Sequence, residues 1–191
     1  ATVDEPVTLN LINRVTRSLA ANHGKFVRAA VSSSGNYGTV SLQKTYLAFG
    51  STDMQQDIEA IPGYKAVSDY GSMKTAHEME IGCVGSVRFI LSPDMPKVAD
   101  VGAAIAGTTN LSTTGTSADV YQLFIVAKDA WGHTAFRGLS AFKYNHIPVG
   151  KVDKSDPTGE RGYCSTTFYD AGVVTNHGWM AVCECTVSAL T

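Results

Sequence analysis

The sequence predicts an α+β fold, with one amphipathic helix near its start and a series of short strands after it. In the first part of the chain, apolar residues recur at the spacing of a long helix. Later runs are rich in β-branched and aromatic residues, and 18 glycines and 6 prolines divide them into short segments. A length of 191 residues suits one domain, or two small lobes that share a core.

The first expected element is a helix of about five turns over residues 7–22. Asp4 is a residue type that caps helix N-termini, and the first turn tolerates a proline such as Pro6. Gly24 is the expected stop. The apolar stripe consists of Val7, Leu11, Ile12, Val15 and Leu19. Such a stripe needs a sheet or another helix to cover it.

The next segments alternate between strands and turns. The expected strands cover residues 26–31, 39–47, 64–70 and 86–91, and a short helix covers residues 52–61. Residues 98–118 differ in kind, because they are small and polar and include no aromatic side chain. Such a stretch cannot bury enough surface to fix itself, so we expect a long exposed loop there.

The last part of the chain predicts four more strands. Residues 120–127 form a nearly continuous apolar run, as expected for a strand buried on both faces. Three further strands are expected over residues 135–144, 163–174 and 179–189. Residues 175–178 are expected to be the tight turn that joins the last two strands.

The composition narrows the classes of function. Charged residues make up 17% of the chain, against roughly 25% in typical globular proteins. This low charge density suggests that something else covers much of the surface. The net charge is −2, and the basic residues, among them Arg14, Arg17, Lys25 and Arg28, look scattered along the chain. The overall charge therefore argues against a nucleic-acid clamp, which needs a basic stripe. No signal peptide or membrane-spanning run is recognisable.

The four cysteines have neither C-x-x-C nor zinc-finger spacing. Cys183 and Cys185 would point to the same face of a strand, where a reduced thiol behaves as a small hydrophobe. We therefore favour reduced core cysteines over a disulfide or a metal site. A cluster of these two cysteines with His177 is the weakest metal hypothesis.

Motifs that carry chemistry are missing. The chain has no G-x-S-x-G elbow, and Gly150-Lys151 lacks the remainder of a phosphate-binding loop. His77 lacks the second histidine of a zincin, because position 81 is Ile. No nucleophile, base and orienting group fall at a recognisable spacing. We therefore expect no enzyme, no cofactor and no metal.

Four segments taken in order resemble the second half of a tailed-phage major capsid protein, in the N-four-like family. They cover residues 77–93, 119–132, 156–174 and 176–190. The first contains the pattern E-x-G-x-x-G-x-x-R-F, from Glu80 to Phe89. The second ends in a K-D-A-aromatic-G turn, the third begins with D-P-x-G-x-R-G, and the fourth has an aromatic-Met-Ala strand at Trp179.

The resemblance implies the Hong Kong 97-type capsid fold. That fold has a peripheral lobe with a spine helix and a sheet, and an axial lobe around a central sheet. The two lobes would be interleaved in a single unit over residues 1–191, with residues 7–22 as the spine helix and 98–118 as an exposed loop. In the family an N-terminal arm and an extended hairpin loop precede the part that this chain resembles. The resemblance therefore implies that this chain lacks both.

The function implied is that of a structural coat protein, or of a fragment of one, found in the virion and assembled in the bacterial host cytoplasm. Copies would associate into pentamers and hexamers of an icosahedral shell that encloses double-stranded DNA without sequence-specific binding and without a membrane. The expected contacts between subunits come from one charged segment: Lys151, Asp153, Lys154, Asp156, Glu160 and Arg161. Two alternatives stay open, an encapsulin-like protein compartment and a virion decoration or binding protein.

Overall fold

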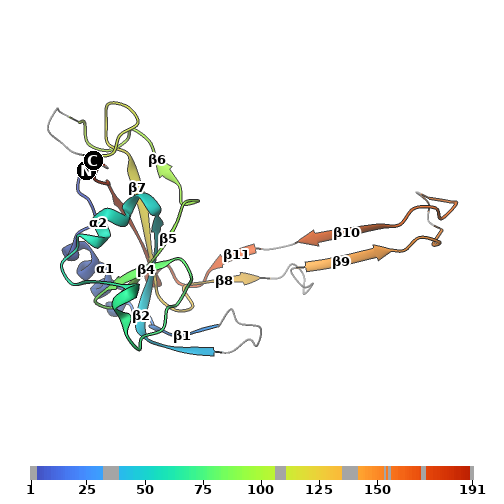
Figure 1. The fold of residues 1–191 in the computed structure, drawn as a ribbon, viewed down its shortest axis with the longest axis horizontal. Helices are drawn as coiled ribbons and strands as arrows, with labels where there is room; N and C mark the ends of the chain where they lie inside the picture. Colours follow the sequence, from blue (N-terminus) through green and yellow to red (C-terminus); the bar gives the residue numbers. More distant parts are fainter. Residues whose placement is uncertain are drawn as a thin grey trace. The chain divides into compact units, whose positions relative to one another are not determined.

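The computed structural model describes residues 4–31, 39–105, 111–134, 142–152, 154, 156–168 and 171–189. It has a mixed α+β architecture that is mostly sheet with few helices (Figure 1). Contacts divide the chain into two units. Unit 1 comprises Ala1–Ala130 and Asn176–Thr191, and unit 2 comprises Trp131–Thr175.

Unit 1 is built on one sheet. Among the described residues its strands are ordered β12-β7-β2-β5-β4-β3, with β1 paired to β2 and β6 paired to β7. The pairing of β2 with β5 is parallel, and the others are antiparallel. The strands are β1 (Val27–Val31), β2 (Thr39–Ser51), β3 (Tyr64–Ala66), β4 (Glu80–Val84), β5 (Val87–Ser92), β6 (Lys97–Val98), β7 (Val120–Val126) and β12 (Met180–Cys185).

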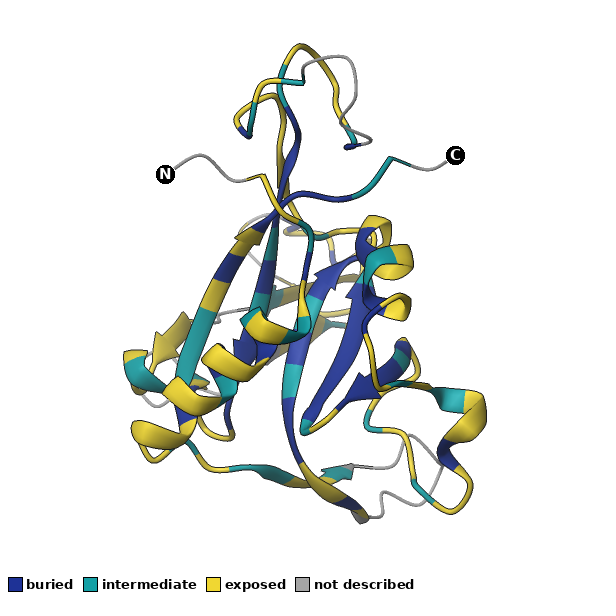
Figure 2. Cartoon of the chain, turned by 90° about the vertical axis from the view of Figure 1, so that its left-hand side faces the viewer, coloured by how far each residue is buried: buried dark blue, intermediate teal, exposed yellow. Residues whose placement is uncertain are grey.

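Helix α1 (Leu9–Ala21) supplies the apolar stripe that the sequence predicts. Ile12, Val15 and Leu19 are buried in the main core, together with strand residues that include Tyr46 and Phe89. Figure 2 shows the helix in front of the buried strands with its outer side exposed. A short 3₁₀ turn, η1 (Thr52–Met54), and helix α2 (Gln55–Glu59) add further buried side chains to this core.

The N-terminal end of α1 differs from the expectation. The N-cap is Thr8, not Asp4, because Thr8 has extended backbone and its hydroxyl accepts a hydrogen bond from the Leu11 N–H at 3.4 Å. At the other end the C-cap is Asn22, and Gly24 closes the helix as expected, because its N–H donates to the Leu19 carbonyl at 2.8 Å. The helix is therefore 13 residues long and shorter than the predicted five turns.

Several strand predictions need correction. Strand β4 was missed, and the strand expected over residues 64–70 ends at Ala66 and continues as a 3₁₀ turn, η2 (Val67–Tyr70). The last two strands do not form a hairpin with each other. After the 3₁₀ turn η4 (His177–Trp179), β12 instead pairs with β7, over a register that runs from Met180↔Val126 to Cys185↔Tyr121. In this position Cys183 and Cys185 are buried in the core.

The described parts of the loop over residues 98–118 are tied to the sheet by a buried carboxylate. Asp119 accepts hydrogen bonds from the backbone N–H groups of Asp100 and Thr114, and its carboxylate lies 3.6 Å from the Lys97 ammonium. Burial alone would raise the pKa of Asp119. A hydrogen bond from the Thr114 hydroxyl, the two backbone bonds and the nearby ammonium outweigh burial and lower that pKa. Leu111, near the end of the loop, is itself buried.

Unit 2 is a β-hairpin made of two antiparallel ladders. Strand β8 (Trp131–Thr134) pairs with β11 (Ala171–Val174), and β9 (Phe142–Ile147) pairs with β10 (Tyr163–Phe168). Much of the strand expected at 135–144 lies outside the described residues, as do two residues inside the strand expected at 163–174. The pairing of these strands into one hairpin was not predicted from the sequence.

Candidate functional site

The E-x-G-x-x-G-x-x-R-F segment forms the hairpin of β4 and β5. Val84 pairs with Val87 across a turn that contains Gly85, whose φ of 58° is one that glycine adopts without strain. Gly82 serves another purpose, because a Cβ atom there would lie 2.4 Å from the Lys65 carbonyl and 2.6 Å from the Tyr64 ring. The first glycine of the motif thus lets β3 approach, and the second makes the turn.

The two charged residues of the motif form a buried ion pair. The Arg88 guanidinium lies 3.1 Å from a Glu80 carboxylate oxygen, and Arg88 is only 2% exposed. Glu80 also accepts hydrogen bonds from the Tyr70 hydroxyl and from the Ala76 N–H, both at 2.6 Å. Arg88 also donates to the Lys74 carbonyl at 2.6 Å. Burial, and then the hydrogen bond to Glu80, raise the pKa of Tyr70.

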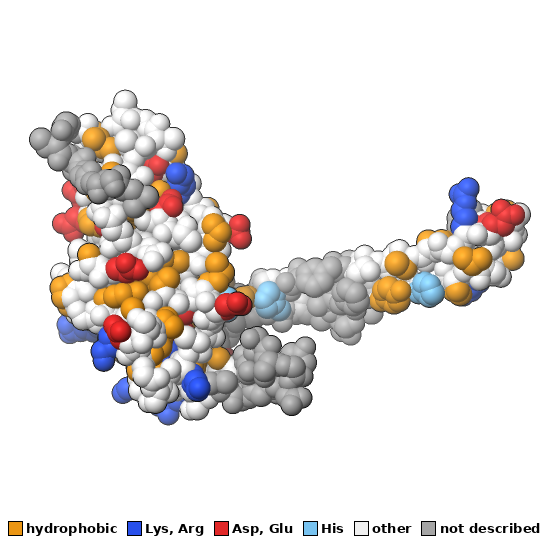
Figure 3. Space-filling model, in the orientation of Figure 1, with side chains coloured by type: hydrophobic (Ala, Val, Ile, Leu, Met, Phe, Trp, Pro, Cys, Tyr) orange, Lys and Arg blue, Asp and Glu red, His pale blue; other side chains and the backbone are white. Residues whose placement is uncertain are grey.

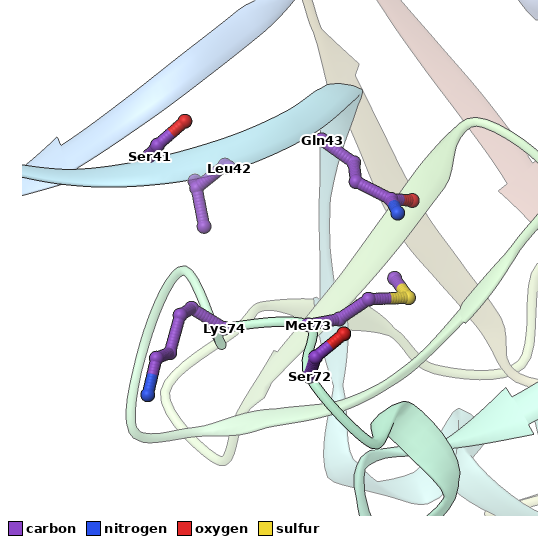
Figure 4. A pocket seen from close by; sticks show the side chains of 6 residues that line it. All are labelled: Ser41, Leu42, Gln43, Ser72, Met73 and Lys74. Atoms are coloured by element: carbon purple, nitrogen blue, oxygen red, sulfur yellow. The ribbon is translucent and has the colours of Figure 1, made fainter.

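This cluster fixes residues 70–76 to the sheet. Buried charges need partners, and both sides of the pair find them in the 70–76 segment. Among the described residues, however, the second terminal nitrogen of Arg88, Nη2, is buried without a hydrogen-bond partner. Beside it, Ser72, Met73 and Lys74 face Ser41, Leu42 and Gln43 of β2 across a shallow hollow of about 190 Å³ (Figure 4). No residue of the motif from Glu80 to Phe89 lines this hollow.

An apolar row crosses the sheet on the face opposite α1. Val182, Phe124, Phe49 and Ile90 lie directly opposite one another on four adjacent strands, so their side chains share one face. Ile90 is buried, Phe124 and Phe49 are half-buried, and Val182 on the edge strand is 50% exposed. Buried and exposed residues alternate along β12: Cys183 and Cys185 face the core, and Val182 and Glu184 face outward. This alternation is the sequence signal for the apolar row. Sequence reasoning did not single it out.

Unit 2 contains no hydrophobic core among its described residues. Its buried residues there are Asp156 and Gly159, neither of which is a large apolar side chain. Its exposed apolar side chains are Trp131, Tyr144, Val149, Val152, Tyr163, Val173 and Val174. A two-stranded hairpin on its own is at best marginally stable in water.

The predicted contact segment forms the end of this hairpin. Lys151, Lys154, Glu160 and Arg161 are exposed, and Asp153 lies outside the described residues. Asp156 differs, because it is buried and its carboxylate accepts from the Arg161 backbone N–H at 2.7 Å and the Thr158 hydroxyl at 3.0 Å.

These bonds, above all the one from the Arg161 N–H, lower the pKa of Asp156. The Asp156 carboxylate therefore organises the turn.

The cysteines are free thiols in the structure. Cys83, Cys183 and Cys185 are buried, and Cys164 on β10 is exposed. Burial raises the pKa of Cys183, and it raises that of Cys185 to about 12. Among the residues that the structure describes, no three His, Cys, Asp or Glu side chains come together as a metal site would require. No described helix is long and apolar enough to cross a membrane.

Comparisons with known proteins give limited matches. No protein-family model matches the chain, and no curated protein matches it. Among solved structures, a chain from the head structure of Helicobacter pylori bacteriophage KHP40 aligns with a TM-score of 0.40 and 12% sequence identity. The alignment covers 87% of this chain and 44% of that chain, so this chain spans less than half of its length.

Proposed function

We propose that this chain is a structural coat protein, or part of one, whose copies associate into the icosahedral shell of a tailed bacteriophage. The observation that carries the proposal is the hairpin of unit 2, which exposes seven large apolar side chains and has no described core. Two-stranded ribbons of this kind gain stability by packing against another protein surface. In a homo-oligomer that surface belongs to another copy, and repeated weak contacts then close a shell.

The sequence motifs support the same proposal. The Glu80 to Phe89 pattern, by which the chain resembles the N-four-like coat family, builds a buried structural cluster rather than a reactive site. In the proposed Hong Kong 97-type arrangement, α1 is the spine helix and the sheet of unit 1 is the scaffold. The shell encloses double-stranded DNA in the virion, without sequence-specific binding, after assembly in the cytoplasm of the bacterial host.

Charged side chains at the end of unit 2 complete the proposed contact between subunits. Lys151, Lys154, Glu160 and Arg161 are exposed and of mixed sign, which suits ion pairs with a neighbouring copy. Each exposed pair contributes only about 0–1 kcal/mol, so we assign them the orientation of the contact rather than its strength. The apolar side chains of the hairpin supply the strength.

The mass of the protein in solution tests the proposal, measured by light scattering on a sizing column. We expect pentamers, hexamers or larger particles for the unmodified chain. The double variant Tyr144→Ser with Tyr163→Ser should shift the mass towards the monomer, because both side chains are exposed on unit 2. Val98→Ser with Val101→Ser is the matched control, since it removes exposed apolar side chains from unit 1.

A monomer at every concentration, or equal behaviour of the two double variants, would overturn the assignment of unit 2 as the assembly surface. DNA inside the particles would distinguish a phage shell from a compartment that holds protein cargo.

A further inference from the structure

The basic residues of unit 1, which look scattered in the sequence, belong to a region of the chain that contains no acid. Residues 6–52 include no Asp or Glu, and they carry five basic side chains: Arg14, Arg17, Lys25, Arg28 and Lys44. The net charge of the chain is −2, so the remaining residues carry −7. The near-neutral total thus hides a strong separation of charge along the chain.

The fold brings four lysine and arginine side chains to the start of β1. Lys25 forms a backbone bridge with Lys128, whose N–H donates to the Lys25 carbonyl at 2.8 Å. The Lys44 ammonium lies 5.7 Å from the centre of the ring of Phe26, the residue that follows Lys25. Arg28 follows on the same strand. We call Lys25, Arg28, Lys44 and Lys128 the β1 basic cluster.

Helix α1 extends this cluster. Its C-terminal end is held beside Lys25, because the Trp179 indole N–H donates to the Asn22 carbonyl at 2.9 Å and Gly24 packs against Ala127. Arg14 and Arg17 lie one turn apart on its exposed side. On the face shown in Figure 3, most Lys and Arg side chains of unit 1 lie toward its lower end, and most Asp and Glu side chains lie above them.

These cations lack carboxylate partners among the described residues. The ion pairs in the structure join Arg88 to Glu80 and Lys97 to Asp119, and neither involves the cluster. The acid next to the cluster in sequence is Asp129, which is exposed. Six exposed cations against one carboxylate leave a local excess of positive charge that attracts polyanions.

The surroundings favour nucleic acid over a protein partner. A stable protein interface has an apolar centre. None of the exposed large hydrophobic side chains lies within the described residues before Met79, which include every member of this surface except Lys128. Contact with a phosphate backbone needs only cations, and the dense charge of a duplex tolerates their irregular spacing. We infer that the β1 basic cluster, with Arg14 and Arg17 of α1, is a non-specific binding surface for the phosphate backbone of duplex DNA.

This inference rests on the proposed function and deepens it, because it names the surface of the coat subunit that faces the enclosed DNA. It also revises the view taken from overall charge, under which DNA would meet no attractive surface. The contact is electrostatic and independent of sequence. It neutralises only a few phosphates for each subunit, so each contact remains weak and sensitive to salt.

The test measures binding of the full chain to a short duplex DNA of arbitrary sequence, by fluorescence anisotropy over a series of salt concentrations. Six phosphate contacts predict a fall in affinity of about a thousandfold between about 50 and about 200 mM salt. The quadruple variant Lys25→Gln, Arg28→Gln, Lys44→Gln and Lys128→Gln should bind much more weakly, and its remaining affinity should fall only about tenfold over that range.

The control removes charge elsewhere on unit 1, as Lys65→Gln with Lys74→Gln, both exposed, and should keep the original salt dependence. Thermal unfolding verifies that both variants fold. Absence of DNA binding at low salt, or equal losses in the two variants, would overturn the inference. It would also fail if the cluster variant lost self-association while its DNA binding stayed unchanged, since the surface would then serve a protein partner.

Sedimentation of the same samples separates this inference from the proposed function. Self-association without DNA binding would refute the DNA-facing surface alone. Cluster-dependent DNA binding by a chain that remains monomeric would support the surface and count against the coat-protein proposal.

Discussion

The buried ion pair of Glu80 and Arg88 gives the sharpest test of how the family-like motif works. In Arg88→Met the Glu80 carboxylate stays buried and keeps only the Tyr70 hydroxyl and the Ala76 N–H as donors, while the Lys74 carbonyl loses its donor. Removing one member of a buried pair costs about 3–5 kcal/mol. We expect Arg88→Met to lower the free energy of unfolding by that amount.

A double-mutant cycle separates the pair from simple loss of packing. Glu80→Gln keeps one acceptor oxygen where Tyr70 and Ala76 donate to two, and it leaves the Arg88 cation unpaired, so it should also be strongly destabilising. The double variant has no buried charge, and its cost should fall short of the sum of the two single costs by at least about 2 kcal/mol.

Urea unfolding followed by circular dichroism measures all three free energies. Additive effects within about 0.5 kcal/mol, or a cost below about 1 kcal/mol for Arg88→Met, would refute the structural reading of the motif.

Three further predictions concern the described core. Gly82→Ala should destabilise by about 1–3 kcal/mol or more, because its Cβ would meet backbone at 2.4 Å, whereas Gly132→Ala meets no atom within 4 Å and serves as the control in the same urea assay. The pKa of Tyr70 is raised by burial and by its carboxylate partner, so its contribution to stability is present below the ordinary pKa of about 10 and is lost as the pH rises above it. In Tyr70→Phe, unfolding at alkaline pH should therefore release about one proton fewer, so that stability falls less steeply as the pH rises. An unchanged pH profile would contradict this. A thiol reagent should label the exposed Cys164 quickly and Cys185, whose pKa is raised to about 12, only on unfolding. Mass spectrometry of the labelled peptides measures both rates, and equal rates would show that the burial assigned to Cys185 is wrong.

Local patterns predicted the features that depend on nearest neighbours in the chain. The stripe of Ile12, Val15 and Leu19 was confirmed because helical periodicity fixes which side chains share a face. The core position of Cys183 and Cys185 was confirmed because alternation does the same for a strand. The N-cap was placed at Asp4 because sequence spacing does not show where the backbone turns from extended to helical. The structure places that change at Thr8.

Such local patterns could not predict which distant segments pair with each other. Strand β2 pairs along its length with β1, β5 and β7, and nothing in its sequence specifies the parallel register of Tyr46 with Val87. The basic cluster was hidden for the same reason, because Lys25 and Lys128 are brought together only by a bridge between distant segments. Charge that looks scattered along a chain gathers on a surface when the strand order places it there.

The central claim is that the hairpin of unit 2 acquires its stability from a neighbouring copy, and hydrogen exchange of its backbone amides tests this most directly. Exchange would be followed by mass spectrometry on the dilute monomer and on the concentrated, associated protein. Backbone amides in peptides covering β9 and β10 should exchange almost freely in the monomer and become protected on association. Peptides from β5 and β7, in the core of unit 1, should stay protected in both. Full protection of β9 and β10 in a verified monomer, or no gain on association, would contradict the account.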